Sequence, residues 1–257
     1  MSTSALGPEL LLALRLIVLT DRDLAAPCTV EEVVEKALLG GASAIQLRDK
    51  GVSAGELLEV GQRLRELTRR HDALLFVNDR LDVALAAGAD GVHVGPEDLP
   101  VAALRARVPA GFLIGYSCDD VAQAHSAVAA GADYIGCGAV YGTTTKTGAG
   151  SAIGLERLNA LAATVDVPVV AIGGITPERA GQVATTGAAG IAVAGGVMAA
   201  ADPAEAVRRL MEPFQSRSAA PYGVAATVTS MRARTTRSPS MMASTTSSPS
   251  TTDPTAV

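Results

Sequence analysis

Residues 88–94 read Gly-Ala-Asp-Gly-Val-His-Val, and residues 131–136 read Gly-Ala-Asp-Tyr-Ile-Gly. In each stretch a glycine follows a segment with helical spacing and leads into a short apolar run. Glycine readily adopts the left-handed conformation that ends many helices. Related tetrapeptides, Gly-Ala-Ser-Ala and Gly-Ala-Ala-Gly, stand at 41–44 and 187–190. This recurrence predicts a chain built from repeated units in which a helix stops and a strand begins.

Apolar runs alternate with amphipathic segments along most of the chain. We predict eight strands, at 15–20, 44–47, 74–77, 91–94, 113–116, 134–136, 168–172 and 190–193. We predict helices at 30–39, 54–70, 119–130, 155–163, 177–186 and 203–212. Strands that alternate with helices favour a parallel sheet. The chain has 257 residues, 48% of them hydrophobic, which suits a single α/β domain of the (β/α)8 TIM-barrel type.

An open, doubly wound sheet is the alternative architecture. Its dinucleotide-binding form carries a glycine fingerprint directly after the first strand. Here Thr20-Asp21-Arg22-Asp23 stands at that place. The sequence therefore favours the closed barrel.

The composition divides the chain into three parts. An N-terminal extension covers 1–14, the catalytic barrel covers 15–214, and a Ser/Thr-rich tail covers 215–257. A segment with few apolar residues cannot bury enough surface to offset its conformational entropy. We therefore expect the tail to be disordered. An extension without function is the favoured interpretation, and a regulatory role for its four arginines is the alternative.

Charge and cysteine usage narrow the classes of function. The formal charge is −5, which gives no electrostatic footprint for nucleic acid or for an anionic membrane surface. The apolar N-terminal stretch is interrupted by Glu9 and Arg15 and is too short to span a bilayer. Three scattered cysteines form no disulfide framework and no zinc motif. We expect a cytoplasmic protein that acts on small molecules, and a homo-oligomer is compatible with the sequence.

Cationic residues follow the second predicted strand. The two-residue period of a strand places Gln46, Arg48 and Lys50 on one side, with Leu47 and Asp49 on the other. Barrels of this kind carry their chemistry at the C-terminal ends of the strands. Arginine and lysine at that place suit a diphosphate. A surface salt bridge with Asp49 is the alternative interpretation.

Carboxylates follow the third and fourth strands. Asn78 and Asp79 come after one, and Asp98 comes soon after the other. Two neighbouring carboxylates without a histidine favour a hard cation, and Mg²⁺ commonly takes one or two carboxylates plus phosphate oxygens. Asp79 and Asp98 are thus the predicted metal ligands. Each could instead cap the helix that follows it.

The later strand ends carry hydroxyls and glycines. Ser117 follows the fifth strand, and the segment 141–150 after the sixth includes Thr143, Thr144, Thr145 and Lys146. Gly173 and Gly174 follow the seventh strand, and Ala194 and Gly195 follow the eighth. Backbone N–H groups after the last two strands often hold a phosphate in such barrels. Glycines that serve only as turns are the alternative.

Taken in order, these strand-end segments resemble the thiamine phosphate synthase family over roughly 15–214. The matching pieces are Gln46–Lys50, Asn78–Arg80, Gly91–Gly95 onward to Asp98, Gly115–Ser117, Thr143–Lys146 and Ala171–Ile175. The resemblance implies a transferase that condenses 4-amino-5-hydroxymethyl-2-methylpyrimidine diphosphate with 4-methyl-5-(2-phosphoethyl)thiazole, or with its 2-carboxy form. The products would be thiamine phosphate and pyrophosphate. The implied mechanism is dissociative and Mg²⁺-assisted: pyrophosphate leaves first, and the thiazole nitrogen then attacks a pyrimidine-methyl cation.

The resemblance also implies roles for individual residues. It makes Arg48, Lys50, Ser117 and Lys146 catalytic, and Asp79 and Asp98 ligands of Mg²⁺. The implied substrate-binding residues are Gln46, Leu47, Arg48, Asp49, Lys50, Asn78, Ser117, Thr143, Thr144, Thr145, Lys146, Gly174, Ala194 and Gly195.

Several positions depart from the family pattern. Pro96 stands where a glutamine is usual, Gly142 replaces a common proline, and Ala194-Gly195-Gly196 replaces a valine–serine stretch. Cys118-Asp119 stands where relatives often carry a histidine. Two alternative functions stay open: a thiazole tautomerase, a paralogue that works through a histidine, and a non-catalytic barrel that binds thiamine precursors.

Overall fold

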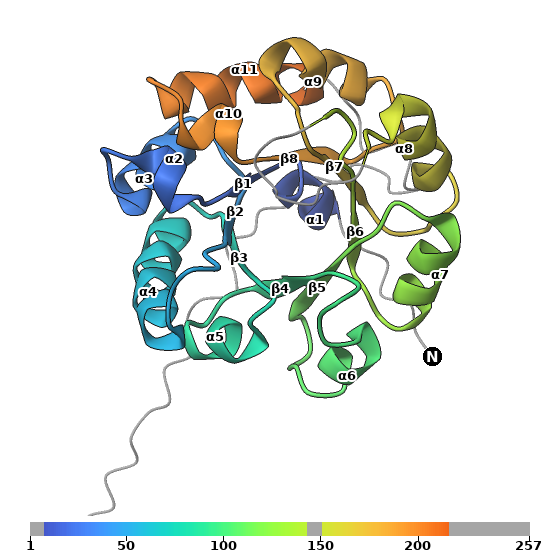
Figure 1. The fold of residues 1–257 in the computed structure, drawn as a ribbon, viewed down its shortest axis with the longest axis horizontal. Helices are drawn as coiled ribbons and strands as arrows, with labels where there is room; N and C mark the ends of the chain where they lie inside the picture. Colours follow the sequence, from blue (N-terminus) through green and yellow to red (C-terminus); the bar gives the residue numbers. More distant parts are fainter. Residues whose placement is uncertain (1–7, 143–150, 216–257) are drawn as a thin grey trace, which may run out of the picture. The chain divides into compact units, whose positions relative to one another are not determined.

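Eight parallel strands form a closed barrel in which each strand pairs with its neighbour in sequence and β8 pairs with β1. The computed structural model describes residues 8–142 and 151–215. In Figure 1 the strands form a central ring, and most of the helices lie around it. The strands are β1 Leu16–Leu19, β2 Ala44–Leu47, β3 Leu74–Asn78, β4 Gly91–Val94, β5 Leu113–Ser117, β6 Tyr134–Cys137, β7 Val169–Ile172 and β8 Gly190–Val193. The predicted TIM barrel and all eight predicted strands are confirmed.

The larger helices also lie where the sequence predicts them. They are α3 Val30–Leu39, α4 Ala54–Arg70, α7 Val121–Ala129, α8 Gly154–Ala162, α9 Pro177–Ala184 and α11 Pro203–Gln215. The helix α11 continues past Pro213 because Phe214 is buried against the core. Gln215 therefore belongs to this helix rather than to the predicted tail, and 216–257 lie outside the described residues.

Short helices complete the fold, and the sequence analysis did not delimit them. They are α1 Pro8–Ala13, α2 Arg22–Ala25, α5 Leu81–Ala86, α6 Val101–Arg105 and α10 Gly195–Met198. Segments of four to six residues contain too few turns to display a helical period.

Side chains alternate between two apolar layers along each strand. Leu75 and Val77 of β3 join a large cluster between the strands and the outer helices. Phe76, between them, joins a smaller cluster with Ile17, Tyr134 and Val170 inside the barrel. This alternation is the period of two expected of a strand. On β2 the same period places Ala44, Gln46 and then Arg48 on the side that faces the interior of the barrel.

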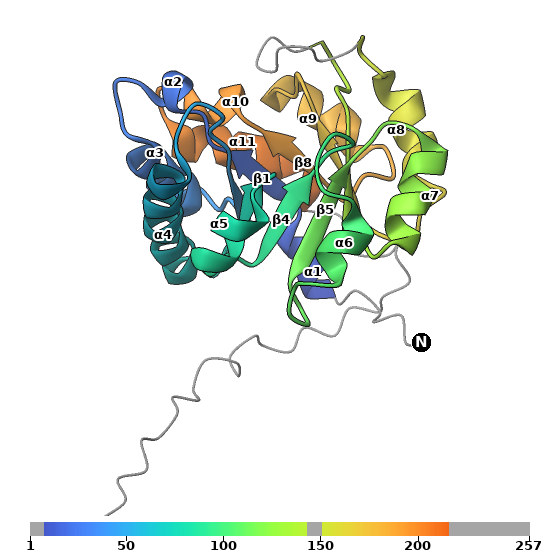
Figure 2. The same ribbon diagram turned by 60° about the horizontal axis from the view of Figure 1, so that its bottom comes forward.

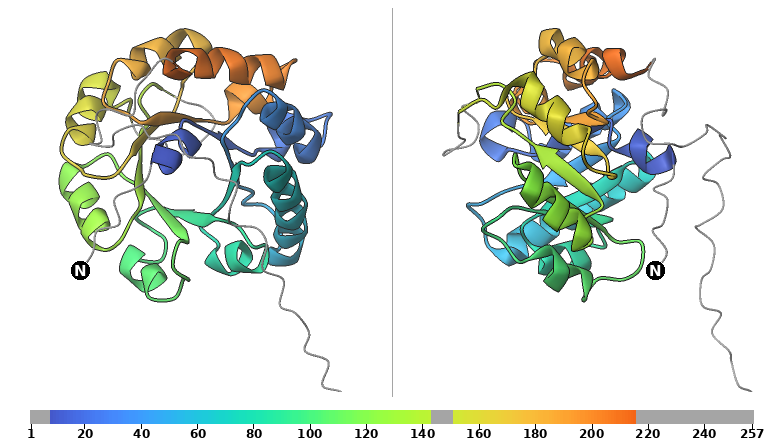
Figure 3. Two further views of the ribbon diagram at one scale, coloured as in Figure 1. Left: turned by 180° about the vertical axis from the view of Figure 1, so that it is seen from behind. Right: turned by 90° about the vertical axis from the view of Figure 1, so that its right-hand side faces the viewer.

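The helix α1 lies across one end of the barrel (Figures 2 and 3). Leu14, just after this helix, is fully buried in the inner cluster, and Leu10 packs partly against it. The predicted N-terminal extension therefore contains a structural part of the barrel. The sequence analysis missed it because its apolar run resembles a free amphipathic end.

The repeated Gly-Ala-Xaa motif has a structural purpose beyond stopping helices. Its third residue accepts a hydrogen bond from the backbone N–H at the start of the preceding strand. Ser43 Oγ accepts from Leu16 at 3.1 Å, Asp90 Oδ2 from Leu75 at 2.8 Å, and Asp133 Oδ2 from Ile114 at 2.7 Å. In the fourth copy Ala189 has no side-chain acceptor. Three copies thus join neighbouring strands at their N-terminal ends.

An arginine completes two of these junctions. Arg65 Nη1 and Nη2 donate to the two oxygens of Asp90 at 2.6 and 2.9 Å. Arg105 pairs with Asp133 and also donates to the carbonyl oxygens of Gly131 and Phe112. These pairs lie opposite the end of the barrel that carries the functional residues.

We predict that Asp90→Ala lowers the free energy of unfolding by about 2 to 4 kcal/mol, because it leaves a mostly buried guanidinium and the Leu75 N–H without their acceptor. Urea denaturation measures this change. The matched control is Asp82→Ala, which removes an exposed pair with Arg80 and is expected to cost less than about 1 kcal/mol. Equal losses in the two variants would contradict the structural role of Asp90.

Candidate active site at the strand ends

Thr20, at the end of β1, fixes the backbone at Arg48. Its Oγ1 accepts from the Arg48 N–H at 2.9 Å and donates to the Arg48 carbonyl oxygen at 3.2 Å. The Thr20 N–H in turn donates to the Gln46 carbonyl oxygen at 2.9 Å. Thr20 is 2% exposed. This buried hydroxyl extends the pairing of β1 and β2 to the C-terminal ends of the strands, which we call the rim.

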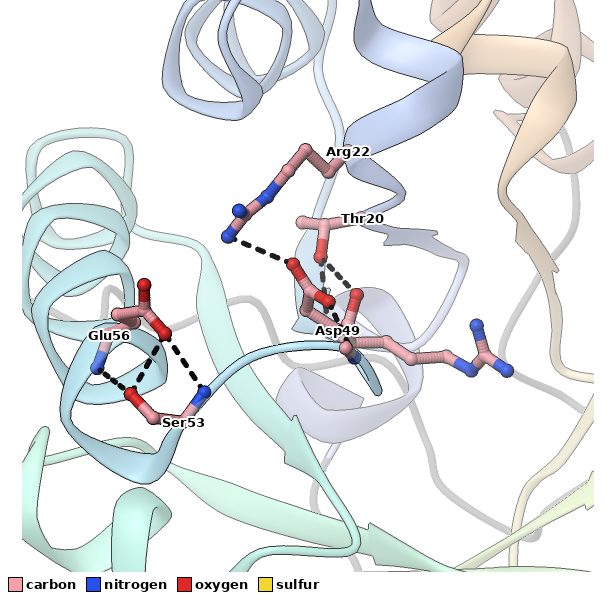
Figure 4. A network of polar contacts seen from close by, with 7 residues as sticks. Thr20, Arg22, Asp49, Ser53 and Glu56 are labelled. Carbon is pink, nitrogen blue, oxygen red and sulfur yellow. Dashed lines mark hydrogen bonds and ion pairs between the residues drawn. The ribbon is translucent and has the colours of Figure 1, made fainter.

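Asp49 is held by Arg22 rather than by its cationic neighbours in sequence. The Arg22 Nη2 and Asp49 Oδ2 atoms lie 3.0 Å apart (Figure 4). The loop then turns into α4 through a capping box between Ser53 and Glu56, also drawn in Figure 4. The alternative interpretation, a surface salt bridge of Asp49 with Arg48 or Lys50, is therefore wrong, since the aspartate pairs with Arg22 of α2.

Leu47 lies on the outer side of β2, as its spacing predicts, whereas Asp49 borders the same groove as Arg48 and Lys50. Leu47 is 2% exposed and packs among the outer helices, so its side chain cannot line the rim. A groove of about 340 Å³ is bordered by three cations, Arg22, Arg48 and Lys50, and by three carboxylates, Asp21, Asp23 and Asp49. Within the described residues, no salt bridge occupies the Arg48 guanidinium. This charge is available to an anion.

Asp79 and Asp98 face each other at the rim, as predicted. The pKa of Asp79 lies above its ordinary value because of burial, its hydrogen bond to Asp98 and the charge of Asp98, and the ammonium of Lys50 only partly offsets these effects. The Lys50 Nζ and Asp79 Oδ2 atoms lie 3.6 Å apart. The structure thus brings the two carboxyl groups and one cation together.

The backbone explains how Asp79 reaches this place. Its φ of 62° lies in the left-handed region, where aspartate is tolerated better than most residues. Its N–H donates to the His93 carbonyl oxygen of β4 at 2.9 Å. The chain therefore turns sharply at the end of β3 toward the loop that carries Asp98.

Neither aspartate caps the helix that follows it. The helix α5 has Arg80 at its N-cap, α6 has Pro100, and neither shows a side-chain capping bond. Asp98 Oδ2 instead accepts from the Gly95 N–H at 2.7 Å within its own loop. The capping alternative is wrong for both residues, which leaves their carboxylates for another purpose.

Ser117 lies at the end of β5 and contacts a histidine that the sequence analysis did not assign. His93 Nε2 and Ser117 Oγ are 2.7 Å apart, and His93 Nδ1 lies 2.9 Å from the Tyr134 hydroxyl. The one available signal was glycine inside two neighbouring strands, at Gly115 and Gly136, since glycine there often marks a close approach.

The ends of β7 and β8 have the backbone that the sequence predicts. Gly173 and Gly174 adopt φ values of 98° and 65°, and a Cβ at Gly174 would collide with Gly142 and Tyr141. The Gly174 carbonyl oxygen accepts from Arg179 Nη1 at 2.7 Å. A helical turn starts at Gly195, directly after Ala194. Thr143, Thr144, Thr145 and Lys146 lie outside the described residues.

The two buried cysteines, Cys118 and Cys137, are poorly suited to act as nucleophiles. Burial raises the pKa of Cys118 to about 11 and that of Cys137 to about 12. A thiol with such a pKa is protonated at neutral pH and therefore a poor nucleophile.

Residues 16–197 match the family model described as Thiamine monophosphate synthase. The chain belongs to the thiamine monophosphate synthase family. The resemblance predicted from the strand-end segments is thus confirmed. The match covers all eight strands and ends within α10, before α11.

Named relatives agree with the family. The thiamine-phosphate synthase of Moorella thermoacetica is 49% identical over 181 residues, which cover 70% of this chain and 86% of the relative. That of Archaeoglobus fulgidus is 50% identical over 184 residues, covering 72% and 86%. The solved structure of thiamine phosphate pyrophosphorylase from Pyrococcus furiosus superposes with a TM-score of 0.73 at 45% identity, covering 79% of this chain and 96% of that one.

Other barrels share the fold alone. The structure of 3-hexulose-6-phosphate synthase superposes with a TM-score of 0.57 at 22% identity, covering 77% of this chain and 99% of that one.

Across residues 8–142 and 151–215, no helix is long and apolar enough to cross a membrane.

We predict that Thr20→Val weakens pyrophosphate binding by about tenfold, or about 1.4 kcal/mol, because Arg48 loses both hydrogen bonds that fix its backbone. Thr20→Ser keeps the hydroxyl and is expected to bind as the wild type does. Isothermal titration calorimetry in the presence of Mg²⁺ compares the three proteins. Unchanged affinity in Thr20→Val would show that the Arg48 backbone needs no such support.

Proposed function

We propose that this barrel is a thiamine-phosphate synthase that joins hydroxymethylpyrimidine diphosphate to thiazole phosphate, plain or carboxylated, and releases pyrophosphate. The observation that carries the proposal is the meeting of Asp79, Asp98 and Lys50 at the rim. A carboxylate pair beside cations suits a diphosphate bound with a metal ion. Relatives named for this activity share up to half of the aligned residues.

The two aspartates fit the Mg²⁺ that this activity would use. Burial and the neighbouring Asp98 raise the pKa of Asp79, so a divalent cation held by the two carboxylates would relieve the cost of ionising both. Mg²⁺ typically takes few protein ligands and completes its shell with water and phosphate oxygens. Among the described residues no cluster of three or more His, Cys, Asp or Glu forms a closed metal cage. We propose Asp79 and Asp98 as the Mg²⁺ ligands.

The remaining rim residues would act on the diphosphate and on the pyrimidine. When bound, Mg²⁺ would neutralise charge on the departing pyrophosphate. The Arg48 guanidinium would offer paired donors to its oxygens, and Lys50 would offer a compact charge. Gln46, 3% exposed beneath them, and Asn78 would contact the same substrate. Pre-positioned donors of this kind act because they match the charge that develops as the leaving group departs.

The second substrate would bind on the opposite part of the rim. Gly174, with its left-handed backbone, and the turn that begins at Ala194 and Gly195 would present N–H groups to the thiazole phosphate. Ser117 would contact the pyrimidine substrate between the two sites. Lys146 and its neighbouring threonines would complete the site. The thiazole nitrogen then needs only to be held near the pyrimidine methylene carbon for the bond to form.

The two alternative functions are less well supported. A tautomerase of the paralogous kind needs a histidine after β5, where this chain has Cys118, and the thiol stays protonated because burial raises its pKa. A precursor-binding barrel without activity has no use for paired carboxylates beside two cations. The charges of the rim therefore support the synthase.

We further propose that the reaction takes place in the cytoplasm and that the partners are small molecules only, as the acidic composition indicates. A homo-oligomer is compatible with this function because the rim of a single barrel supplies each proposed residue in the described part of the chain.

We predict that the purified full chain, supplied with Mg²⁺ and both substrates, releases pyrophosphate and forms thiamine phosphate. Coupled detection of pyrophosphate and chromatography of the product measure both. Arg48→Ala is expected to lower turnover at least tenfold, whereas Arg63→Ala, which breaks a surface pair with Glu31, leaves it unchanged. If both substrates bind and no product forms, the chain is a precursor-binding protein instead.

We predict that Asp79→Asn raises the melting temperature of the Mg²⁺-free protein at pH 7. The raised pKa means that ionisation of Asp79 costs stability in the folded state, and the neutral amide avoids this cost. The difference in melting temperature between Asp79→Asn and the wild type is present above the raised pKa of Asp79. It disappears as the pH falls toward the ordinary pKa of 3.8.

The control variant, Asp82→Asn, is expected to shift the melting temperature in the opposite direction. Arg80 holds the pKa of Asp82 below its ordinary value, so Asp82→Asn is expected to lower the melting temperature slightly. Differential scanning fluorimetry compares the variants. A fall in melting temperature for Asp79→Asn would mean that its carboxylate is stabilised rather than strained in the absence of metal.

A further inference from the structure

A chain of three polar side chains crosses the interior of the barrel from β6 through β4 to β5. The Tyr134 hydroxyl lies 2.9 Å from His93 Nδ1, and His93 Nε2 lies 2.7 Å from Ser117 Oγ. Tyr134 is fully buried, His93 is 9% exposed, and Ser117 is partly exposed at the rim. The row of hydrogen-bonded side chains therefore leads from the sealed core to the candidate active site.

Glycines in the neighbouring strands make room for these three side chains. A Cβ on Gly115 would overlap the Tyr134 ring and His93 Nδ1, and a Cβ on Gly136 would lie 3.0 Å from His93 Cε1. Glycine inside a strand weakens it, so two such positions around one ring indicate a space kept for that ring. The Phe76 ring packs edge-on against Tyr134 with centroids 5.4 Å apart and holds it in place.

The direction of the hydrogen bonds follows from the buried phenol. Burial raises the pKa of Tyr134 far above its usual range, so the phenol keeps its proton. In the described part of the chain, His93 Nδ1 is the acceptor within reach of that proton. If Nδ1 carried a hydrogen, the phenol proton would be buried without an acceptor, which costs about 1 to 3 kcal/mol. Tyr134 therefore donates to an unprotonated Nδ1.

Donation from Tyr134 to Nδ1 determines which hydrogen bond His93 makes with Ser117. A neutral imidazole with an unprotonated Nδ1 carries its hydrogen on Nε2. Nε2–H then donates to Ser117 Oγ, which leaves the serine hydroxyl proton free to point elsewhere. Because Ser117 is partly exposed at the rim, that proton can reach a bound ligand.

We propose that His93, oriented by Tyr134, is a positioning residue that fixes Ser117 as a hydrogen-bond donor toward an acceptor atom of the diphosphate substrate. The proposal rests on the function proposed above. The bond from Nε2–H occupies one lone pair of Ser117 Oγ, so the hydroxyl proton is not used by His93 and remains for an acceptor on the substrate.

The tautomer can be measured without any turnover. In protein labelled with ¹⁵N-histidine, two-bond correlation spectra distinguish a protonated ring nitrogen from an unprotonated one. The chain has three histidines, and the His93→Gln variant identifies the His93 signals by their loss. We expect an unprotonated Nδ1 and a protonated Nε2. A protonated Nδ1, or an averaged mixture of tautomers, would overturn the proposal even if the enzyme is active.

Kinetics test whether Tyr134 and His93 act through Ser117. Tyr134→Phe keeps the ring and removes the donor, and we expect it to lower kcat/KM about fivefold when Ser117 is present. In a Ser117→Ala background the same change is expected to have no further effect. His93→Gln, whose amide can donate to Ser117 in place of Nε2, is expected to retain more activity than His93→Met. Equal loss from Tyr134→Phe in both backgrounds would show a structural role and overturn the proposal.

Discussion

Closure of eight parallel strands into one ring is the constraint on which the site depends. Each strand pairs in register with its neighbour, so the C-terminal ends of all strands meet at one rim. Residues that are far apart in sequence, such as Lys50 and Asp98, reach the same place because β2, β3 and β4 are paired neighbours.

The two ends of the barrel use aspartate in opposite ways. At the N-terminal ends, Asp90 and Asp133 are satisfied by arginines and by strand N–H groups. At the rim, Asp79 adopts a left-handed backbone and faces Asp98, and its pKa is raised by burial and by Asp98. The first arrangement stabilises the fold and the second costs stability. A structure that tolerates such repulsion is compatible with a site that receives a cation.

The sequence predicted the strands and the rim residues because the evidence for them is local. The Gly-Ala-Xaa repeat marks where strands begin, and the two-residue period separates Gln46 and Arg48 from Leu47. The role of α1 could not be predicted, because its apolar face gains meaning only when a barrel end is present to cover. Thr20 and the Tyr134–His93–Ser117 chain were missed for the same reason, since their partners lie on other strands.

The central claim is that the carboxylate pair and the nearby cations form one metal-dependent diphosphate site. Calorimetric titration of pyrophosphate, with and without Mg²⁺, into the wild type and into Asp79→Asn and Asp98→Asn variants tests it most directly. The account predicts that binding requires Mg²⁺ and weakens at least tenfold in both variants. Binding of pyrophosphate that is equally tight without Mg²⁺, or unaffected by either substitution, would contradict it.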